Sequence, residues 1–172
     1  MEQKSKIKPA LLVIDIQNFS LKFIPDADKE AALTMINLYI DMFRKHKFPV
    51  IRIYHVSEKH GLKEGTEDFE FTKSAAITSQ DPIIIKTYPD SFYKTDLDKL
   101  LKEKGCNTLF LCGLSSVGCV LATWMGAFNH DYKAFLVKDA IMSHKKDYTT
   151  NIEIMFDAAG YDMIEFILEN AE

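Results

Sequence analysis

Short apolar runs alternate with longer amphipathic stretches along most of the chain. The runs have the length and apolar composition of buried strands, which predicts strands over residues 10–16, 49–56, 82–86, 108–112, 133–139 and 162–168. Between most of them apolar residues recur at helical spacing, which predicts helices over about 28–46, 95–105 and 147–159, and from about residue 117 onward. This alternation predicts an α/β fold, with a parallel sheet, right-handed crossovers and helices on both faces.

One segment, residues 57–81, departs from this pattern. It is polar, contains glycine and has no clear strand or helix period. Long connections of this kind in compact domains are often functional, so we expect a surface insertion or a lid over a site.

Composition limits the classes of protein to which the chain can belong. Its 172 residues suit one domain spanning 1–172, and 47% hydrophobic with 27% charged residues is typical of a globular protein. The formal net charge is −4 and no basic stripe is present, so we expect no nucleic-acid partner. No apolar run approaches the ~20 residues of a membrane span, and the polar N-terminus lacks a signal peptide. We therefore expect a cytoplasmic protein with no membrane partner.

Cysteine usage also excludes two kinds of site. The chain has three cysteines and no CxxC pair, which argues against a disulfide framework and against a structural zinc site.

Three residues with useful chemistry lie at the carboxyl ends of predicted strands, where open parallel sheets bind ligands. They are Asp15, Lys86 and Cys119. Each has an ordinary structural alternative: a carboxylate that caps a loop, an ammonium that reaches solvent, and a small buried thiol. Together they supply a base, a cation and a nucleophile, which is the set that acyl transfer through a thiolate requires.

The predicted position of Cys119 favours a reactive thiol. It falls in the first turn of a helix, beside free backbone N–H groups and the positive end of the helix dipole. Such a position lowers a thiol pKa, and the same N–H groups can hold a developing oxyanion.

Four sequence blocks resemble the isochorismatase-like cysteine hydrolase superfamily. Residues 12–19 (LVIDIQNF) resemble its DxQxxF motif, and residues 86–97 (KTYPDSFYKTDL) resemble its K…SxFxxTxL segment. Residues 113–123 (GLSSVGCVLAT) are similar to its GxxTxxCVxxT block, and residues 137–140 (VKDA) to its later DA motif. The blocks occur in the family order over nearly the whole chain.

The resemblance implies a role for each matching residue. Cys119 would be the nucleophile, Asp15 the general base and Lys86 the third member of a catalytic triad. The oxyanion donors would be the backbone N–H groups of Cys119 and Ser115, with a non-proline cis peptide bond between Leu114 and Ser115. The implied fold is a three-layer α/β/α, Rossmann-like domain with a six-stranded parallel sheet.

Further residues are expected around the substrate. Gln17 belongs to the first motif, and four aromatic side chains are expected at the pocket rim, although aromatics are more often plain core. These four are Phe19, Tyr88, Phe92 and Trp124.

Two departures from relatives bear on the reaction. Nicotinamidases carry a DxH pair and a further histidine that hold a metal; here Ile53 stands at the position of that aspartate, leaving His55 and His60. We therefore expect no metal and no cofactor. True isochorismate hydrolases of the family lack the cysteine, so the presence of Cys119 argues against that reaction.

The resulting expectation is a cysteine hydrolase that cleaves a C–N bond of a small amide, carbamoyl or ureido compound through a thioester. Two alternatives stay open: a non-catalytic binding or scaffolding member of the same fold, and a nicotinamidase-type amidase with an atypical metal site. Because such proteins commonly assemble and the chain is 12% aromatic, we also expect a homo-oligomer, a dimer or tetramer.

Overall fold

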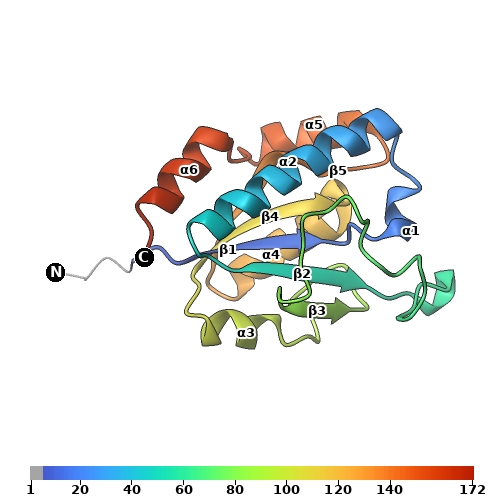
Figure 1. The fold of residues 1–172 in the computed structure, drawn as a ribbon, viewed down its shortest axis with the longest axis horizontal. Coiled ribbons are helices and arrows are strands. Elements are labelled where there is room, and N and C mark those ends of the chain that lie inside the picture. Colours follow the sequence, from blue (N-terminus) through green and yellow to red (C-terminus); the bar gives the residue numbers. More distant parts are fainter. Residues whose placement is uncertain (1–5) are drawn as a thin grey trace.

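The computed structural model describes residues 6–172, which form a parallel sheet between two layers of helices (Figure 1). The sheet has five strands in the order β3-β2-β1-β4-β5. The strands are β1 (Pro9–Ile14), β2 (Val50–His55), β3 (Ile83–Lys86), β4 (Thr108–Leu114) and β5 (Lys133–Met142). The helices are α1 (Asn18–Leu21), α2 (Asp26–Lys45), α3 (Leu97–Glu103), α4 (Leu121–Asn129), α5 (Lys146–Met155) and α6 (Tyr161–Glu169). The predicted α/β fold with a parallel sheet is confirmed.

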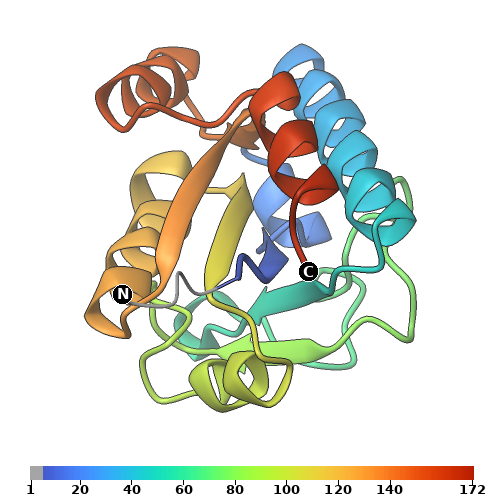
Figure 2. The ribbon, with the colours of Figure 1, turned by 90° about the vertical axis from the view of Figure 1, so that its left-hand side faces the viewer.

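Both faces of the sheet are covered, as Figures 1 and 2 show, with α2 and α6 on one face and α3 and α4 on the other. The central strand β1 is buried along its whole length. Leu11 and Val13 pack in the cluster that includes α2 and α6, whereas Leu12 and Ile14 pack in the cluster that includes α3 and α4. Burial on both faces explains why β1 is continuously apolar rather than alternating.

The prediction of a sixth strand over residues 162–168 is wrong, because this segment lies in the helix α6. Ile164 and Leu168, four residues apart, are buried together on the α2 side of the sheet, while Phe166 between them is 66% exposed. That spacing matches one face of a helix, and a short apolar run does not by itself distinguish helix from strand. Just before α6 there is an isolated parallel bridge between Val137 of β5 and Ala159.

The segment 57–81 is a surface insertion over the carboxyl ends of β1 and β2, and it includes a 3-10 turn, η1 (Glu58–His60). Phe69 and Phe71 are buried, and their rings stack on Tyr54 of β2 at 4.8 and 4.2 Å. Arg52 donates hydrogen bonds to the carbonyl oxygen of Asp81 at the other end of the insertion. The insertion is therefore anchored to the sheet by both apolar and polar contacts.

Within residues 6–172, no helix is both long enough and apolar enough to cross a membrane.

Candidate active site

Asp15 and Lys86 meet at the carboxyl edge of the sheet although one strand separates β1 from β3. The Lys86 ammonium lies 2.8 Å from Asp15 Oδ2, and the two side chains are 0% and 5% exposed. Neighbouring strands are about 4.8 Å apart, so only a long side chain at the end of β3 can reach past β2 to the end of β1. Asp15 itself has a left-handed backbone, with φ of 53°, which aspartate tolerates better than most residues.

Cys119 joins this pair from the turn that follows β4. One carboxylate oxygen of Asp15, one ring nitrogen of His55 and the sulfur of Cys119 all lie within 4.8 Å of one another. The turn is not the regular first helical turn expected from the sequence. It is a π-helical turn, η2 (Ser116–Val120), kinked at Gly118, directly before α4. The structure therefore brings the three predicted catalytic residues together from three separate strand ends.

The environment keeps the proton on the sulfur. Burial, together with the charge of Asp15, raises the pKa of the Cys119 thiol to about 12, although the charge of Lys86 acts in the opposite direction. This shift has the opposite sign to the one expected from a helix N-terminus alone. Burial by itself would lower the pKa of Lys86, but the charges of Asp15 and Cys119 outweigh it, so the pKa of Lys86 is raised. A neutral thiol needs a base at the moment of attack, and Asp15 is placed to be that base.

The turn after β4 also has the predicted peptide geometry. The bond between Leu114 and Ser115 is cis. Just before it, Gly113 has φ of 111°, and a Cβ there would lie 2.1 Å from the carbonyl oxygen of Ile14. Glycine is therefore required where β4 passes closest to β1, one residue before Asp15.

His55 is a member of the cluster that the sequence did not assign to catalysis. Its backbone is fixed by Gln17, whose amide donates to the His55 carbonyl at 3.0 Å and accepts from the His55 N–H at 2.8 Å. Gln17, expected to contact substrate, is fully buried and holds His55. Burial and then the charge of Lys86 lower the pKa of His55. The available sequence signal was the position of His55 at the end of a strand next to that of Asp15.

The other expected binding residues divide into two groups. Phe19, Leu114 and Ser115 line a cavity of about 220 Å³, together with Ser20, Phe23, Ile24 and His144. Phe92 is instead buried against His130, with ring centroids 4.7 Å apart, and the Trp124 indole donates to the Ala134 carbonyl at 3.1 Å. Tyr88 is exposed and packs edge-on against Tyr93. None of Phe92, Trp124 and Tyr88 lines this cavity.

Comparison with known proteins gives the family. The isochorismatase domain model matches residues 9–164. The chain belongs to the isochorismatase family of hydrolases. A curated relative from this family, the uncharacterized protein YddQ of Bacillus subtilis (strain 168), is 34% identical over 139 residues, which cover 76% of each chain.

Solved structures share the isochorismatase-like fold. The isochorismatase-like hydrolase from Alkaliphilus metalliredigens superimposes with a TM-score of 0.78 at 24% identity, covering 94% of this chain and 98% of the other. N-carbamoylsarcosine amidase from Thermoplasma acidophilum superimposes with a TM-score of 0.74 at 23% identity, covering 90% and 95%.

A metal of the kind that some isochorismatase-like enzymes hold does not fit these residues. Asp15, His55 and Cys119 each offer a ligand atom. However, the Lys86 ammonium already lies 2.8 Å from Asp15 Oδ2 and 3.4 Å from His55 Nδ1. A divalent cation on those atoms would face a like charge at short range in a buried site. Ile53, fully buried beside this cluster in β2, offers no ligand atom.

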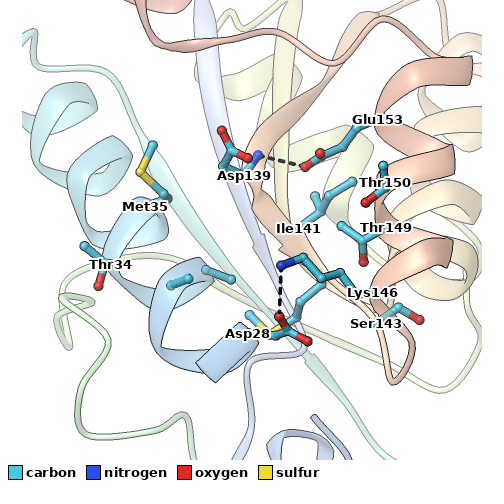
Figure 3. A pocket seen from close by; sticks show the side chains of 13 residues that line it. Asp28, Thr34, Met35, Asp139, Ile141, Ser143, Lys146, Thr149, Thr150 and Glu153 are labelled. Carbon is cyan, nitrogen blue, oxygen red and sulfur yellow. Dashed lines mark hydrogen bonds and ion pairs between the residues drawn. The ribbon is translucent and has the colours of Figure 1, made fainter. Parts of the chain in front are cut away.

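This isochorismatase-family chain has a second, larger cavity of about 470 Å³ between α2, β5 and α5 (Figure 3). Three carboxylates, from Asp28, Asp139 and Glu153, and the ammonium of Lys146 line it. Glu153 Oε1 accepts a hydrogen bond from the Asp139 N–H at 2.7 Å, and Lys146 Nζ lies 3.7 Å from Asp28 Oδ1. None of the predicted catalytic residues lines this cavity.

Proposed function

We propose that the protein is a cysteine hydrolase that cleaves the C–N bond of a small amide, carbamoyl or ureido compound through a thioester intermediate. The observation that carries this proposal is the buried cluster of a neutral thiol, a carboxylate and an ammonium at the sheet edge. The fold shared with an N-carbamoylsarcosine amidase supports the choice of C–N bonds.

Acylation uses Asp15 twice. As the sulfur of Cys119 attacks the carbonyl carbon, Asp15 accepts the thiol proton, so no free thiolate has to build up. The carbonyl oxygen becomes an oxyanion that the backbone N–H groups of Ser115 and Cys119 stabilise. When the C–N bond breaks, Asp15 returns its proton to the leaving nitrogen, and the acyl group remains on sulfur as a thioester.

Deacylation repeats these proton transfers with water in place of the thiol as the attacking group. Asp15 accepts a proton from the water that attacks the thioester carbonyl, and the C–S bond then breaks as the thiol is protonated again. Throughout, Lys86 stays charged, keeps the carboxylate of Asp15 in place and offsets the negative charge that passes between oxygen and sulfur.

The test is a turnover assay over small amides, ureas and carbamoyl amino acids, with ammonia or amine release as the readout. We expect Cys119→Ala to abolish turnover of whichever substrate the wild type accepts, and Cys106→Ala, a matched change at a buried thiol outside the site, to retain it. The assay is repeated after dialysis against a strong chelator, where we expect unchanged activity. A Cys119→Ala variant that kept most of the activity would sink the proposal.

A further inference from the structure

His55 lies inside the catalytic cluster, yet the mechanism above gives it no task. It is the last residue of β2, paired in register with Lys86 of β3. One of its ring nitrogens is within 4.8 Å of both a carboxylate oxygen of Asp15 and the sulfur of Cys119. An imidazole this close to the reacting sulfur also lies close to any group that a substrate carries next to its scissile carbonyl.

The contact with Lys86 determines which ring nitrogen carries the proton. His55 Nδ1 lies 3.4 Å from the Lys86 ammonium. An ammonium can only donate hydrogen bonds, so Nδ1 must be the acceptor. Burial and the Lys86 charge lower the pKa of His55, which keeps the imidazole neutral near pH 7. A neutral imidazole with an unprotonated Nδ1 carries its proton on Nε2.

The Nε2–H donor is free to bind a ligand. Within residues 6–172, the buried side-chain nitrogen and oxygen atoms without a partner are Asp15 Oδ1 and His46 Nε2, so His55 Nε2 is not among them. The hydrogen bonds of His55 involve its backbone and Nδ1. Nε2 therefore reaches solvent, while the two hydrogen bonds to Gln17 hold the backbone of His55 in place. Such a fixed, unpaired donor suits substrate recognition.

We propose that His55 is a specificity-determining residue, whose Nε2–H donates a hydrogen bond to an acceptor oxygen that the substrate carries beside its scissile carbonyl. A carboxylate is the strongest such acceptor, because charge-assisted hydrogen bonds are about twice as strong as neutral ones. This inference rests on the proposed hydrolase function for its substrate class, but the donor itself can be tested separately.

Two variants separate the two ring nitrogens. His55→Asn places an amide near the position of Nδ1, where it can still meet Lys86, and removes the Nε2 donor. His55→Gln places an amide near the position of Nε2 and so restores a donor. On a carboxylate-bearing substrate such as N-carbamoylglycine, we expect His55→Asn to raise KM about 10- to 100-fold with kcat changed only a few-fold. On propylurea, which lacks the carboxylate, we expect a rise in KM at least several-fold smaller than on N-carbamoylglycine. His55→Gln should recover most of the wild-type preference for the carboxylate-bearing substrate.

A second readout does not depend on hydrolysis. The alkylation rates of Cys119 by iodoacetate and by iodoacetamide, followed by mass spectrometry and each divided by the rate with glutathione, measure the preference for a carboxylate. The ratio of the normalised iodoacetate rate to the normalised iodoacetamide rate should be above one for the wild type. We expect His55→Asn to lower this ratio several-fold and His55→Gln to restore it. Thermal unfolding of each variant serves as the folding control.

The outcomes are distinct. If no substrate is turned over but the alkylation ratio behaves as expected, the hydrolase proposal fails and the donor role stands. If the wild-type ratio does not favour iodoacetate, or if His55→Asn weakens both substrates equally, His55 is a structural residue and this inference is wrong. The wild-type ratio decides the matter even if both variants fail to fold.

Discussion

Two aspartates with left-handed backbones, Asp15 at the end of β1 and Asp139 in β5, have opposite surroundings. Their φ angles are 53° and 60°. Asp15 is 3% exposed and paired with Lys86, whereas Asp139 is exposed and lines the larger cavity beside Glu153. The similar backbone geometry therefore serves a buried charge pair in one place and an open acidic pocket in the other.

The difference shows that the larger cavity is not where charged groups are most deeply buried. The acidic pocket at β5 has about twice the volume of the cavity beside Ser115, but Asp139 is exposed and Glu153 only half-buried, so charge interactions there are weaker than between fully buried groups. At β1 the charges are shielded from water, so the charge of Asp15 raises the pKa values of Lys86 and Cys119, and the charge of Lys86 acts to lower that of Cys119. Changes at the two aspartate sites should therefore have very different effects.

The largest effect is expected from Asp15→Asn. The amide cannot accept the thiol proton, so we expect kcat/KM to fall by about 10²–10⁴-fold, the usual contribution of a general acid–base group. The change is nearly isosteric, so the fold should persist, as circular dichroism would verify. The free energy of unfolding should still fall, because the buried Lys86 ammonium loses its partner. A variant that works within a few-fold of wild type would make Asp15 purely structural.

The same variant should make the thiol more acidic while hydrolysis is lost. Burial and the charge of Asp15 raise the pKa of Cys119, and the charge of Lys86 lowers it, so removing the charge of Asp15 removes part of what raises it. We expect alkylation of Cys119 by iodoacetamide at pH 8 to be faster in Asp15→Asn than in wild type, with Cys106 as the internal reference. Slower alkylation would contradict the assigned direction of the shift.

A smaller effect, followed through stability, is expected from Lys86→Met. The variant should also lose activity, because Lys86 holds the carboxylate of Asp15 in place. The methionine roughly preserves the volume of the lysine stem but leaves the buried carboxylate of Asp15 without its partner. Removing one member of a buried ion pair typically costs about 3–5 kcal/mol. We expect a loss of this order in the free energy of unfolding by urea.

The double variant Asp15→Asn, Lys86→Met serves as the control for that loss. It contains no unpaired charge, so it should recover part of the lost free energy of unfolding. If the single and double variants lost the same free energy, the cost would come from packing around Lys86 and not from the charge of Asp15.

The strands and the residues at their carboxyl ends could be predicted from the sequence, because strands buried on both faces are continuously apolar. Continuous apolar runs identified the five strands of the sheet, and their parallel order placed Asp15, Lys86 and Cys119 at one edge. The C-terminal segment was misassigned because the apolar residues around Ile164 form a run too short to separate the two periods. In the folded chain, Ile164 and Leu168 pack in the same cluster as residues of α2, as one face of a helix.

Proton affinities were harder to predict than positions. A helix N-terminus lowers the pKa of a thiol, and the sequence placed Cys119 in such a turn. The depth of burial and the proximity of the Asp15 charge reverse the sign, and neither can be seen before the chain is folded. The role of His55 was missed for a similar reason, since its contact with Lys86 depends on the register of β2 and β3.

The smallest effect is expected in the acidic pocket, from Glu153→Gln. Glutamine keeps an oxygen that can accept the hydrogen bond from the Asp139 N–H, so the local geometry should persist. Because Glu153 lies outside the catalytic cluster, we expect kcat/KM within about twofold of wild type, in contrast to the loss at Asp15. A loss of tenfold or more would mean that the acidic pocket takes part in the reaction.

The same variant should change stability in a pH-dependent way, and the sign follows from burial. Burial, aided by the charge of Asp139, raises the pKa of Glu153 above its usual value of 4.5. The folded state therefore favours the protonated acid of Glu153. The contribution of this group to the free energy of unfolding is fully present below about pH 4.5 and is lost as the pH rises through the folded-state pKa. Glutamine does not ionise, so Glu153→Gln should be more stable than wild type at pH 7.5, by ~0.5 kcal/mol after allowing for solvent screening. The gain should vanish near pH 4, as urea unfolding at the two pH values would show. If the variant and the wild type differed by the same free energy of unfolding at both pH values, packing and not ionisation would distinguish glutamine from glutamate.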